Sequence, residues 1–297
     1  MMKQFLFYGL TTILFIGCKA QGGQSFIKQK NDNTLLWEIS GNGLKQPSFL
    51  FGTFHLLCKD DIHFSEQLKK AVQSCDEIYM ELDMGDLSTM LSGMLYMNMK
   101  DGKKLESLYT PEEYKRLEKY FSDTLQMPLI LLQRAKPYFL VALLYPRMMN
   151  CKTPAGVEEE LVKIAREDKK QIKGLETMQF QASVFDSIPY EWQAKELIKN
   201  IDSFPVYKKE FDSMLASYKN QQLDSMQNMI GKSEFGSDKY DDLLLNDRNK
   251  NWVMQLREIM KNKSVFVAVG AGHLVGTAGL INLLKKAGYK VEPLENR

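Results

Sequence analysis

Two histidines of the chain stand in the same local setting. His55 lies in LFGTFHLL, residues 50–57, and His273 in AVGAGHLVG, residues 268–276; in each, an apolar run is followed by Gly-x-x-His-Leu. The chain has 3 histidines, so only His63 lies outside the repeated motif. Neutral imidazole is a common metal ligand and a common general base. One copy alone would more often be a core or capping histidine, whereas two copies favour a shared site.

Each apolar run has the composition of a strand and ends in a glycine, which lets the chain turn sharply at the strand end. A side chain three residues later lies in the crevice beyond the carboxyl end of the strand, where open α/β sheets bind their ligands. If the two strands are neighbours, both imidazoles face one crevice. The sequence therefore predicts that His55 and His273 belong to one site.

Three glutamates occupy comparable positions. Glu81 lies near the end of a strand predicted over 77–84, Glu176 ends a short strand over 171–177, and Glu158 opens a helix. Each also has an ordinary explanation, because Glu81 fits a solvated strand face and Glu158 suits the positive end of a helix dipole. Together with the two histidines, they form the nitrogen and oxygen ligand set of a zinc, manganese or iron site.

Other chemistry has less support. Arg248, in LLLNDRNKNW, has the ordinary reading of a solvated helix residue, but in the crevice it would bind a carboxylate or an oxyanion. The glycines of GAGHLVG are spaced one residue too widely for a dinucleotide fingerprint, and no Gly-x-Ser-x-Gly elbow occurs. With 39 basic and 37 acidic residues well mixed, the chain has no basic groove for nucleic acid.

The elements that must position these residues alternate between strands and helices. Strands are predicted over 34–40, 48–52, 77–84, 171–177, 263–270 and 289–294, the first two as a hairpin and 263–270 buried on both faces. Helices are predicted over 65–76, 89–149, 156–170, 178–201, 243–262 and 277–288. This order predicts an α/β fold with a central mixed sheet, flanking helices and a helical insertion. The apolar stretch 127–149 is interrupted by Pro137, Pro146 and charges, which favours buried helices over a membrane span.

The start of the chain is typical of a bacterial lipoprotein. Lys3 precedes an apolar run that ends in FIGC, so residues 1–17 are predicted to be a signal peptide and Cys18 the lipidated mature N-terminus. Residues 18–33 then form a polar tether, and residues 34–297 a single domain. We expect a membrane lipoprotein that faces the periplasm or the cell surface.

Three further cysteines lie in the mature chain. Cys58, Cys75 and Cys151 form no Cys-x-x-Cys pair, which argues against a zinc knuckle. In an oxidising compartment one pair can form a disulfide and leave one thiol over, but the sequence leaves the pairing open. Cys58 follows His55 closely enough to be a soft ligand, although a packed thiol is the simpler interpretation.

These residues make the chain resemble the TraB/GumN family, which includes the Tiki membrane metalloproteases. The resemblance runs from about Leu35 to Leu294 and rests on LFGTFHL, EIYMELD, GVEEEL, KGLET, LLLNDRNKNW and FVAVGAGHLVGTAGLINLLKKAGYKV. It implies an α/β fold of the erythromycin-esterase and haem-binding ChaN-like kind. It also implies proteolysis that depends on a divalent metal such as zinc, manganese or cobalt.

Carried over by position, His55 and His273 are the two hallmark histidines of the family, and Glu81 is their acidic partner. Glu158, Glu176 and Arg248 fall at recurring polar positions. We therefore expect a lipid-anchored metallopeptidase that acts on a peptide or protein. The metal would lie between the histidines and Glu81, and Glu158 or Glu176 would transfer the proton. The alternatives are a lipoprotein that binds haem or a metal without turnover, and a metal-free hydrolase with His55 or His273 as base. The oligomeric state stays open.

Overall fold

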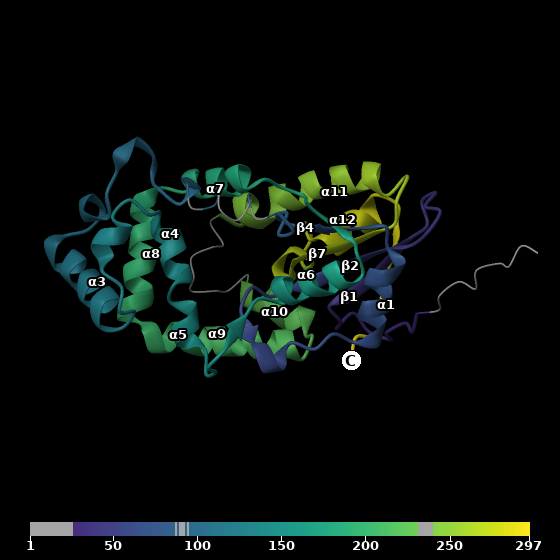
Figure 1. The fold of residues 1–297 in the computed structure, drawn as a ribbon, viewed down its shortest axis with the longest axis horizontal. Coiled ribbons are helices and arrows are strands. Elements are labelled where there is room, and N and C mark those ends of the chain that lie inside the picture. The colour runs from purple at the N-terminus through teal and green to yellow at the C-terminus, as the bar shows by residue number, and fades with distance from the viewer. Residues whose placement is uncertain (1–25, 87, 89–92, 94, 231–239) are drawn as a thin grey trace, which may run out of the picture.

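Within the residues that the structure describes, six strands form one mixed sheet (Figure 1). The computed structural model describes residues 26–86, 88, 93, 95–230 and 240–297. The strand order is β6-β4-β7-β2-β1-β8. The strands are β1 Leu36–Ser40, β2 Ser48–Thr53, β4 Glu77–Met80, β6 Gln171–Gly174, β7 Val265–Gly270 and β8 Lys290–Pro293. β6, β4, β7 and β2 are parallel neighbours, while β1 is antiparallel to both β2 and β8. The predicted α/β fold with a central mixed sheet is confirmed.

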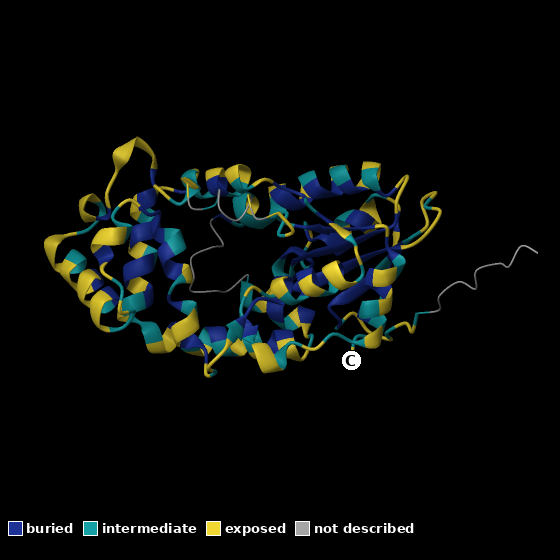
Figure 2. Cartoon of the chain, in the orientation of Figure 1, coloured by how far each residue is buried: buried dark blue, intermediate teal, exposed yellow. Residues whose placement is uncertain are grey.

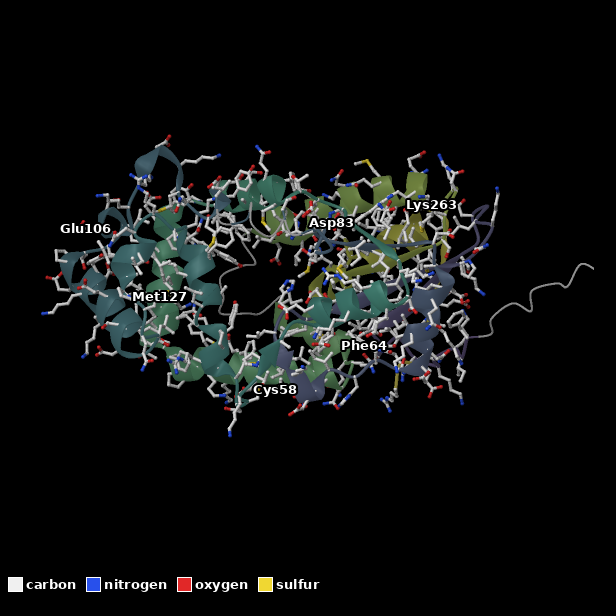
Figure 3. All side chains as sticks on the ribbon, in the orientation of Figure 1. Cys58, Phe64, Asp83, Glu106, Met127 and Lys263 are labelled. Atoms are coloured by element: carbon white, nitrogen blue, oxygen red, sulfur yellow. A yellow bond between two sulfur atoms is a disulfide. The ribbon has the colours of Figure 1, made fainter. Side chains whose placement is uncertain are left out.

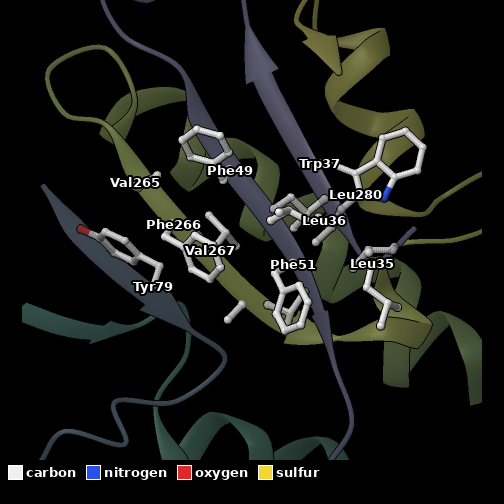
Figure 4. Close-up of a cluster of buried hydrophobic side chains, with 14 of the residues drawn as sticks. Leu35, Leu36, Trp37, Phe49, Phe51, Tyr79, Val265, Phe266, Val267 and Leu280 are labelled. Carbon is white, nitrogen blue, oxygen red and sulfur yellow. The ribbon is translucent and has the colours of Figure 1, made fainter. Parts of the chain in front are cut away.

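The middle of the sheet is its most deeply buried part. Every residue of β2 is buried, and β7 is buried on both faces up to Gly270, as its continuous apolar sequence predicted (Figure 2). Phe51 of β2 and Phe266 of β7 pack with their ring centroids 6.2 Å apart (Figure 4). Since a fully buried large apolar side chain contributes about 1.5–3 kcal/mol, these strands give the site a rigid base.

The chain reverses direction once as it builds the sheet. It runs from β2 through α1 (Glu66–Ser74) to β4 and through α6 (Val157–Glu167) to β6, and then returns to β7 between β4 and β2. Right-handed crossovers place the outward and return helices on opposite faces. Accordingly, α1 and α6 lie on one side of the sheet, and α11 (Asp247–Ile259) and α12 (Leu280–Lys286) on the other (Figure 1). The reversal makes the carboxyl ends of β2, β7 and β4 a topological switch point, where such sheets bind ligands.

A second hydrophobic cluster lies in a helical body beside the sheet (Figure 1). Two chain segments build it, one between β4 and β5 (Pro154–Ala155) and one after β6. Its helices are α3 Pro111–Asp123, α4 Pro137–Ala142, α5 Tyr145–Met148, α8 Tyr190–Asp202 and α9 Phe204–Lys219; α7 Met178–Asp186 and α10 Leu223–Ile230 lie between it and the sheet. Pro137 and Pro146 stand in the first turns of short helices, where proline is favoured. The predicted helical insertion is confirmed.

One strand face differs from the prediction. The alternation over 77–84 suggested a solvated face that included Glu77 and Glu81, but β4 ends at Met80 and all of its residues are buried. Glu77 is paired with Lys173, at 2.9 Å, and with Lys263. Because two lysines neutralise it, this carboxylate is buried at the amino end of the sheet, while Glu81 lies beyond the opposite end.

A disulfide joins Cys58 and Cys151, 93 residues apart in sequence, and leaves Cys75 as a buried free thiol. The pattern of one bridge and one remaining thiol was expected, although Cys58 itself is a disulfide partner and not the packed thiol or soft ligand considered above. Burial raises the pKa of Cys75 to about 12, so this thiol is unreactive at neutral pH. Cys58 belongs to β3 (Leu57–Cys58), which pairs with β5, so the bridge ties the loop after β2 to the loop before α6.

The predicted signal peptide 1–17, Cys18 and the first part of the tether 18–33 lie outside the described residues. No helix among the described residues is long and apolar enough to cross a membrane. The lipid anchor and the single domain over 34–297 stay predictions.

Candidate active site at the carboxyl edge of the sheet

The four parallel strands deliver the predicted site residues to one edge of the sheet. His55 follows β2, His273 follows β7, Glu81 follows β4 and Glu176 follows β6. β2 pairs with β7 in a register that places Thr53 opposite Gly270, so both Gly-x-x-His turns begin side by side. The condition set by the sequence, that the two strands be neighbours, is met.

Gly270 marks the point on which three of these side chains converge. A Cβ built on Gly270 would lie 3.3 Å from Glu81 Oε1, 3.7 Å from His273 Cδ2 and 4.0 Å from His55 Nε2. The backbone N–H of Gly270 also donates to Glu81 Oε1, at 2.9 Å. A side chain at this position would be in tight contact with Glu81 and would occupy the space between these three side chains, which glycine leaves open.

His273 is buried, and its neighbours fix its tautomer. Asn249 Oδ1 lies 2.7 Å from Nδ1, and the amide nitrogen of Asn249 donates to the carbonyls of His273 and Ala278. Nδ1 therefore carries a proton, and Nε2 accepts a hydrogen bond from Arg248 Nη1 at 3.3 Å. Burial lowers the pKa of His273 to about 4, despite the attraction of Glu81. The imidazole is neutral at neutral pH and presents a lone pair to the site.

The Nδ1 atom of His55 is hydrogen-bonded to the carboxylate of Glu158. This Nδ1 lies 2.8 Å from Glu158 Oε1, and Thr53 Oγ1 donates to the same oxygen at 2.6 Å. The hydrogen bond to Glu158 raises the pKa of His55 to about 9. Since 77% of the imidazole is exposed, water screens the pair, and its contribution to stability is at most about 1 kcal/mol. Glu158 lies at the start of α6, as predicted, and its side chain is buried there.

Arg248 connects the remaining carboxylates. Its Nε donates to both oxygens of Glu176, and its Nη2 donates to Glu176 Oε2 at 2.8 Å and Glu81 Oε2 at 2.7 Å. Nη1 donates to the carbonyl of Leu244 and to His273. All five N–H groups of the guanidinium thus have acceptors. Arg248 is saturated, and it can bind a substrate oxygen only after giving up one of these partners.

Glu176 is enclosed by donors. Besides Arg248, the indole Nε1 of Trp252 donates to its Oε1 at 2.9 Å, and Glu176 is 9% exposed. Burial alone would raise the pKa of Glu81, but attraction to His273, in the acid range where that ring is protonated, and to Arg248 lowers it to about 2. Glu81 is therefore charged at neutral pH, and both Glu81 and Glu176 form ion pairs with the buried Arg248.

The helix that carries Arg248 begins in an unusual way. A π-helical segment, Asp242–Asn246, leads directly into α11, where the sequence alone predicted one uninterrupted helix. Single turns of this type are frequent at functional sites, because they re-aim the side chains beside them. Here the π-turn carbonyl of Leu244 holds Nη1 of Arg248 at 2.9 Å.

The donor types suit a divalent metal. Each histidine has a fixed acceptor at Nδ1, which is the usual second partner of a metal-bound imidazole, and Nε2 lies on the side of the site. Within the described residues, no group of three or more His, Cys, Asp or Glu side chains is spaced as a complete metal site. Arg248 donates to the Nε2 lone pair of His273, which a metal would have to take over. Metal ligation by His55, Glu81 and His273 stays a prediction.

Sequence reasoning missed the residues that hold the others in place. Asn249 and Trp252 share one face of α11 with Arg248, Thr53 lies inside the first Gly-x-x-His motif, and Gln181 donates to Glu81 Oε2 at 3.1 Å. The first two stand in LLLNDRNKNW, at one and four residues after the arginine, a spacing that could have marked them. His63 is exposed and outside the site, as its position outside the motif suggested.

The fold and the site define an α/β protein with a histidine–carboxylate–arginine centre at the carboxyl edge of its parallel strands. The chain belongs to the TraB/PrgY/gumN family, which it matches over residues 35–293.

Its curated relatives are metalloproteases. The chain is 21% identical to metalloprotease TIKI2 of Danio rerio, an alignment that covers 90% of this chain and 62% of the relative. It is 23% identical to metalloprotease TIKI1 of Danio rerio, with 93% and 65% covered, and 23% identical to TIKI1 of Homo sapiens, with 89% and 63% covered. The chain thus spans less than two thirds of the length of these relatives. No solved structure matches it.

Proposed function

We propose that the protein is a metal-dependent peptide hydrolase. The observation that supports this most directly is the meeting of His55, His273 and Glu81 at Gly270, in a chain whose relatives are metalloproteases. The proposed ligands are the Nε2 atoms of both histidines and a carboxylate oxygen of Glu81. A divalent metal bound there would polarise a peptide carbonyl and lower the pKa of a water molecule.

The neighbouring residues hold this ligand set. Glu158 accepts a hydrogen bond from Nδ1–H of His55, and Asn249 accepts one from Nδ1–H of His273. Each ring is therefore held in one orientation. Arg248 keeps Glu81 charged and in place, and Glu176 with Trp252 holds Arg248. When His273 uses its Nε2 lone pair for a metal, the N–H of Arg248 that it accepted becomes available to a substrate oxyanion or carboxylate.

Proton transfer is assigned to Glu158. Its hydrogen bonds with the side chains of His55 and Thr53 are both made by Oε1, so Oε2 is the proposed proton acceptor. Glu176 has donors on both oxygens, so its proposed role is to position Arg248.

We further propose that lipid on Cys18 anchors the protein in a bacterial membrane, with the site facing the periplasm or the cell surface. The FIGC sequence supports the anchor, and the Cys58–Cys151 disulfide is typical of an oxidising compartment.

The test is cleavage of a peptide library by protein that lacks residues 1–18. Activity should disappear on exhaustive chelation and return when zinc, manganese or cobalt is added. Metal analysis of the purified protein identifies which ion is carried. Cleavage that is indifferent to chelation contradicts the proposal.

Cleavage that persists after chelation would favour a metal-free hydrolase, and one observation supports this alternative. His55 and Glu158 form an imidazole–carboxylate pair with an exposed ring, the arrangement that positions a histidine for acid–base catalysis. In that case Glu158→Gln should abolish an activity that no chelator affects.

A further inference from the structure

A cavity of about 370 Å³ adjoins the candidate active site. Glu176 is part of both, and the rest of the cavity wall comes from the residues after β4, the end of β6, the β6–α7 connection and the start of α7. The lining residues are Asp83, Tyr96, Gly174, Glu176, Thr177, Met178 and Gln179. Ligand pockets in proteins begin at about 300 Å³, so the space suits one long side chain of a substrate bound across the sheet edge.

The backbone brings the two walls together closely. A Cβ on Gly174 would lie 2.7 Å from the backbone nitrogen of Asp83 and 2.6 Å from the carbonyl oxygen of Glu176. Since backbone atoms cannot move aside as a flexible side chain can, only glycine fits at this position. Asp83 is thereby fixed beside the Glu176 segment, at the end of the sheet that faces the helical body, opposite to Lys263 (Figure 3).

The two carboxylates of the pocket wall, Glu176 and Asp83, differ in whether a cation neutralises them. Glu176 is neutralised by Arg248, at 2.8 Å. Asp83 accepts the N–H of Gly85 through Oδ1, at 3.0 Å, and among the described residues no lysine or arginine pairs with it. A partly buried carboxylate without a cation attracts one. Met178 adds an apolar wall, and Tyr96 an aromatic one, beside it.

We propose that this pocket binds a lysine or arginine side chain of the peptide substrate, with Asp83 as its counter-ion. The apolar Met178 and the ring of Tyr96 suit the aliphatic stem of such a side chain, and Asp83 suits its charged end. The assignment rests on the proposed peptide hydrolase function, since it names the class of substrate that the same site accepts.

The test measures binding and not cleavage, so that it does not depend on catalysis. Short acetylated and amidated alanine–serine peptides carry one central lysine, arginine, citrulline or norleucine, and their binding to the chain lacking residues 1–18 is followed by fluorescence anisotropy. The basic peptides should bind roughly 10- to 100-fold more tightly than the neutral ones, as expected for one charge-assisted hydrogen bond.

Asp83→Asn should remove this preference. The variant keeps an Oδ1 acceptor for the N–H of Gly85, so its fold is retained. Asp60→Asn, the same chemical change at an exposed position outside the pocket, should leave the preference intact. Equal binding of lysine and norleucine peptides, a preference that survives in Asp83→Asn, or no binding of any peptide each overturns the assignment. A preference without cleavage under any metal condition would retain the pocket and refute the hydrolase.

Discussion

Asn249 fixes the protonation of His273. Its side-chain oxygen lies 2.7 Å from Nδ1, while its amide nitrogen donates to two backbone carbonyls, those of His273 at 3.2 Å and Ala278 at 2.9 Å. The amide cannot turn over without losing both bonds, so the oxygen always faces the imidazole. His273 is thereby held in the tautomer that a metal ligand needs.

Asn249→Ala should therefore weaken metal binding about 10- to 100-fold, the usual effect of losing such a partner. Two carbonyls also lose their donor, so the free energy of unfolding should fall by about 1–3 kcal/mol. Calorimetric titration with metal and urea denaturation measure the two effects. Asn251→Ala, two positions along the same helix, is the control, and equal metal affinity in both variants would show that Asn249 does not act on the site.

His55→Ala and His273→Ala should each abolish bound metal and peptide cleavage. Their effects should not add, since either change dismantles the same site. His63→Ala, at an exposed position outside the motif, should retain both properties. Metal analysis and peptide cleavage are measured on all three purified variants. Full metal content in His273→Ala would rule out the proposed ligation.

Gly270→Ala should have the same functional effect without removing any ligand. The new methyl group would lie 3.3 Å from Glu81 Oε1 and 4.0 Å from His55 Nε2, in the space between the proposed metal-ligand atoms. We expect loss of metal with little change in thermal stability. At Gly272 the nearest atom to an added methyl group is the flexible end of Ile230, so Gly272→Ala should keep its metal. Metal retained by Gly270→Ala would place the binding site elsewhere.

The metal-free protein should lose stability in mild acid. Burial lowers the pKa of His273 from 6.5 to about 4, so below pH 6.5 the unfolded chain binds a proton that the folded chain does not. This stability is fully present above pH 6.5 and is lost as the pH falls towards about 4, in total on the order of 3 kcal/mol. Urea denaturation of the parent and His273→Asn across this range measures it. Parallel curves for the two proteins would contradict the assignment to His273.

Cys18→Ala tests the membrane anchor. The parent should incorporate a labelled acyl chain and enter the detergent phase on phase separation, and the variant should do neither. If the variant still carries label and partitions with membranes, Cys18 is not the lipidated residue.

The histidines of the site could be predicted because their signal is local. A buried run, a glycine and a histidine three residues later place a side chain beyond a strand end wherever they occur. The partners of these histidines could not be predicted in this way. Asn249 acts on His273 only because α11 lies beside the turn that follows β7; the spacing of Asn249 after Arg248 could mark its helix, but not its partner. The pairing of Cys58 with Cys151 likewise depends on how the helical body returns to the sheet.

For Glu77 the sequence pattern led to a wrong prediction, that of a solvated strand face. Period-two alternation indicates which residues share a strand face, but it does not say whether that face is exposed. The two lysines that neutralise Glu77 come from β6 and from the turn before β7, far along the chain, and so the face is buried.

The position of β7 in the chain has a consequence for how the protein folds. Its place in the sheet is between β2 and β4, yet it follows both by well over a hundred residues. β2 and β4 are joined only through β7, since each of them pairs with β7 and not with the other. A nascent chain therefore cannot join β2 and β4 into one sheet before β7, which ends at Gly270, is available, and it cannot complete the site before His273. Because such non-local pairing is slow, this order predicts late folding and a prolonged need for protection from aggregation.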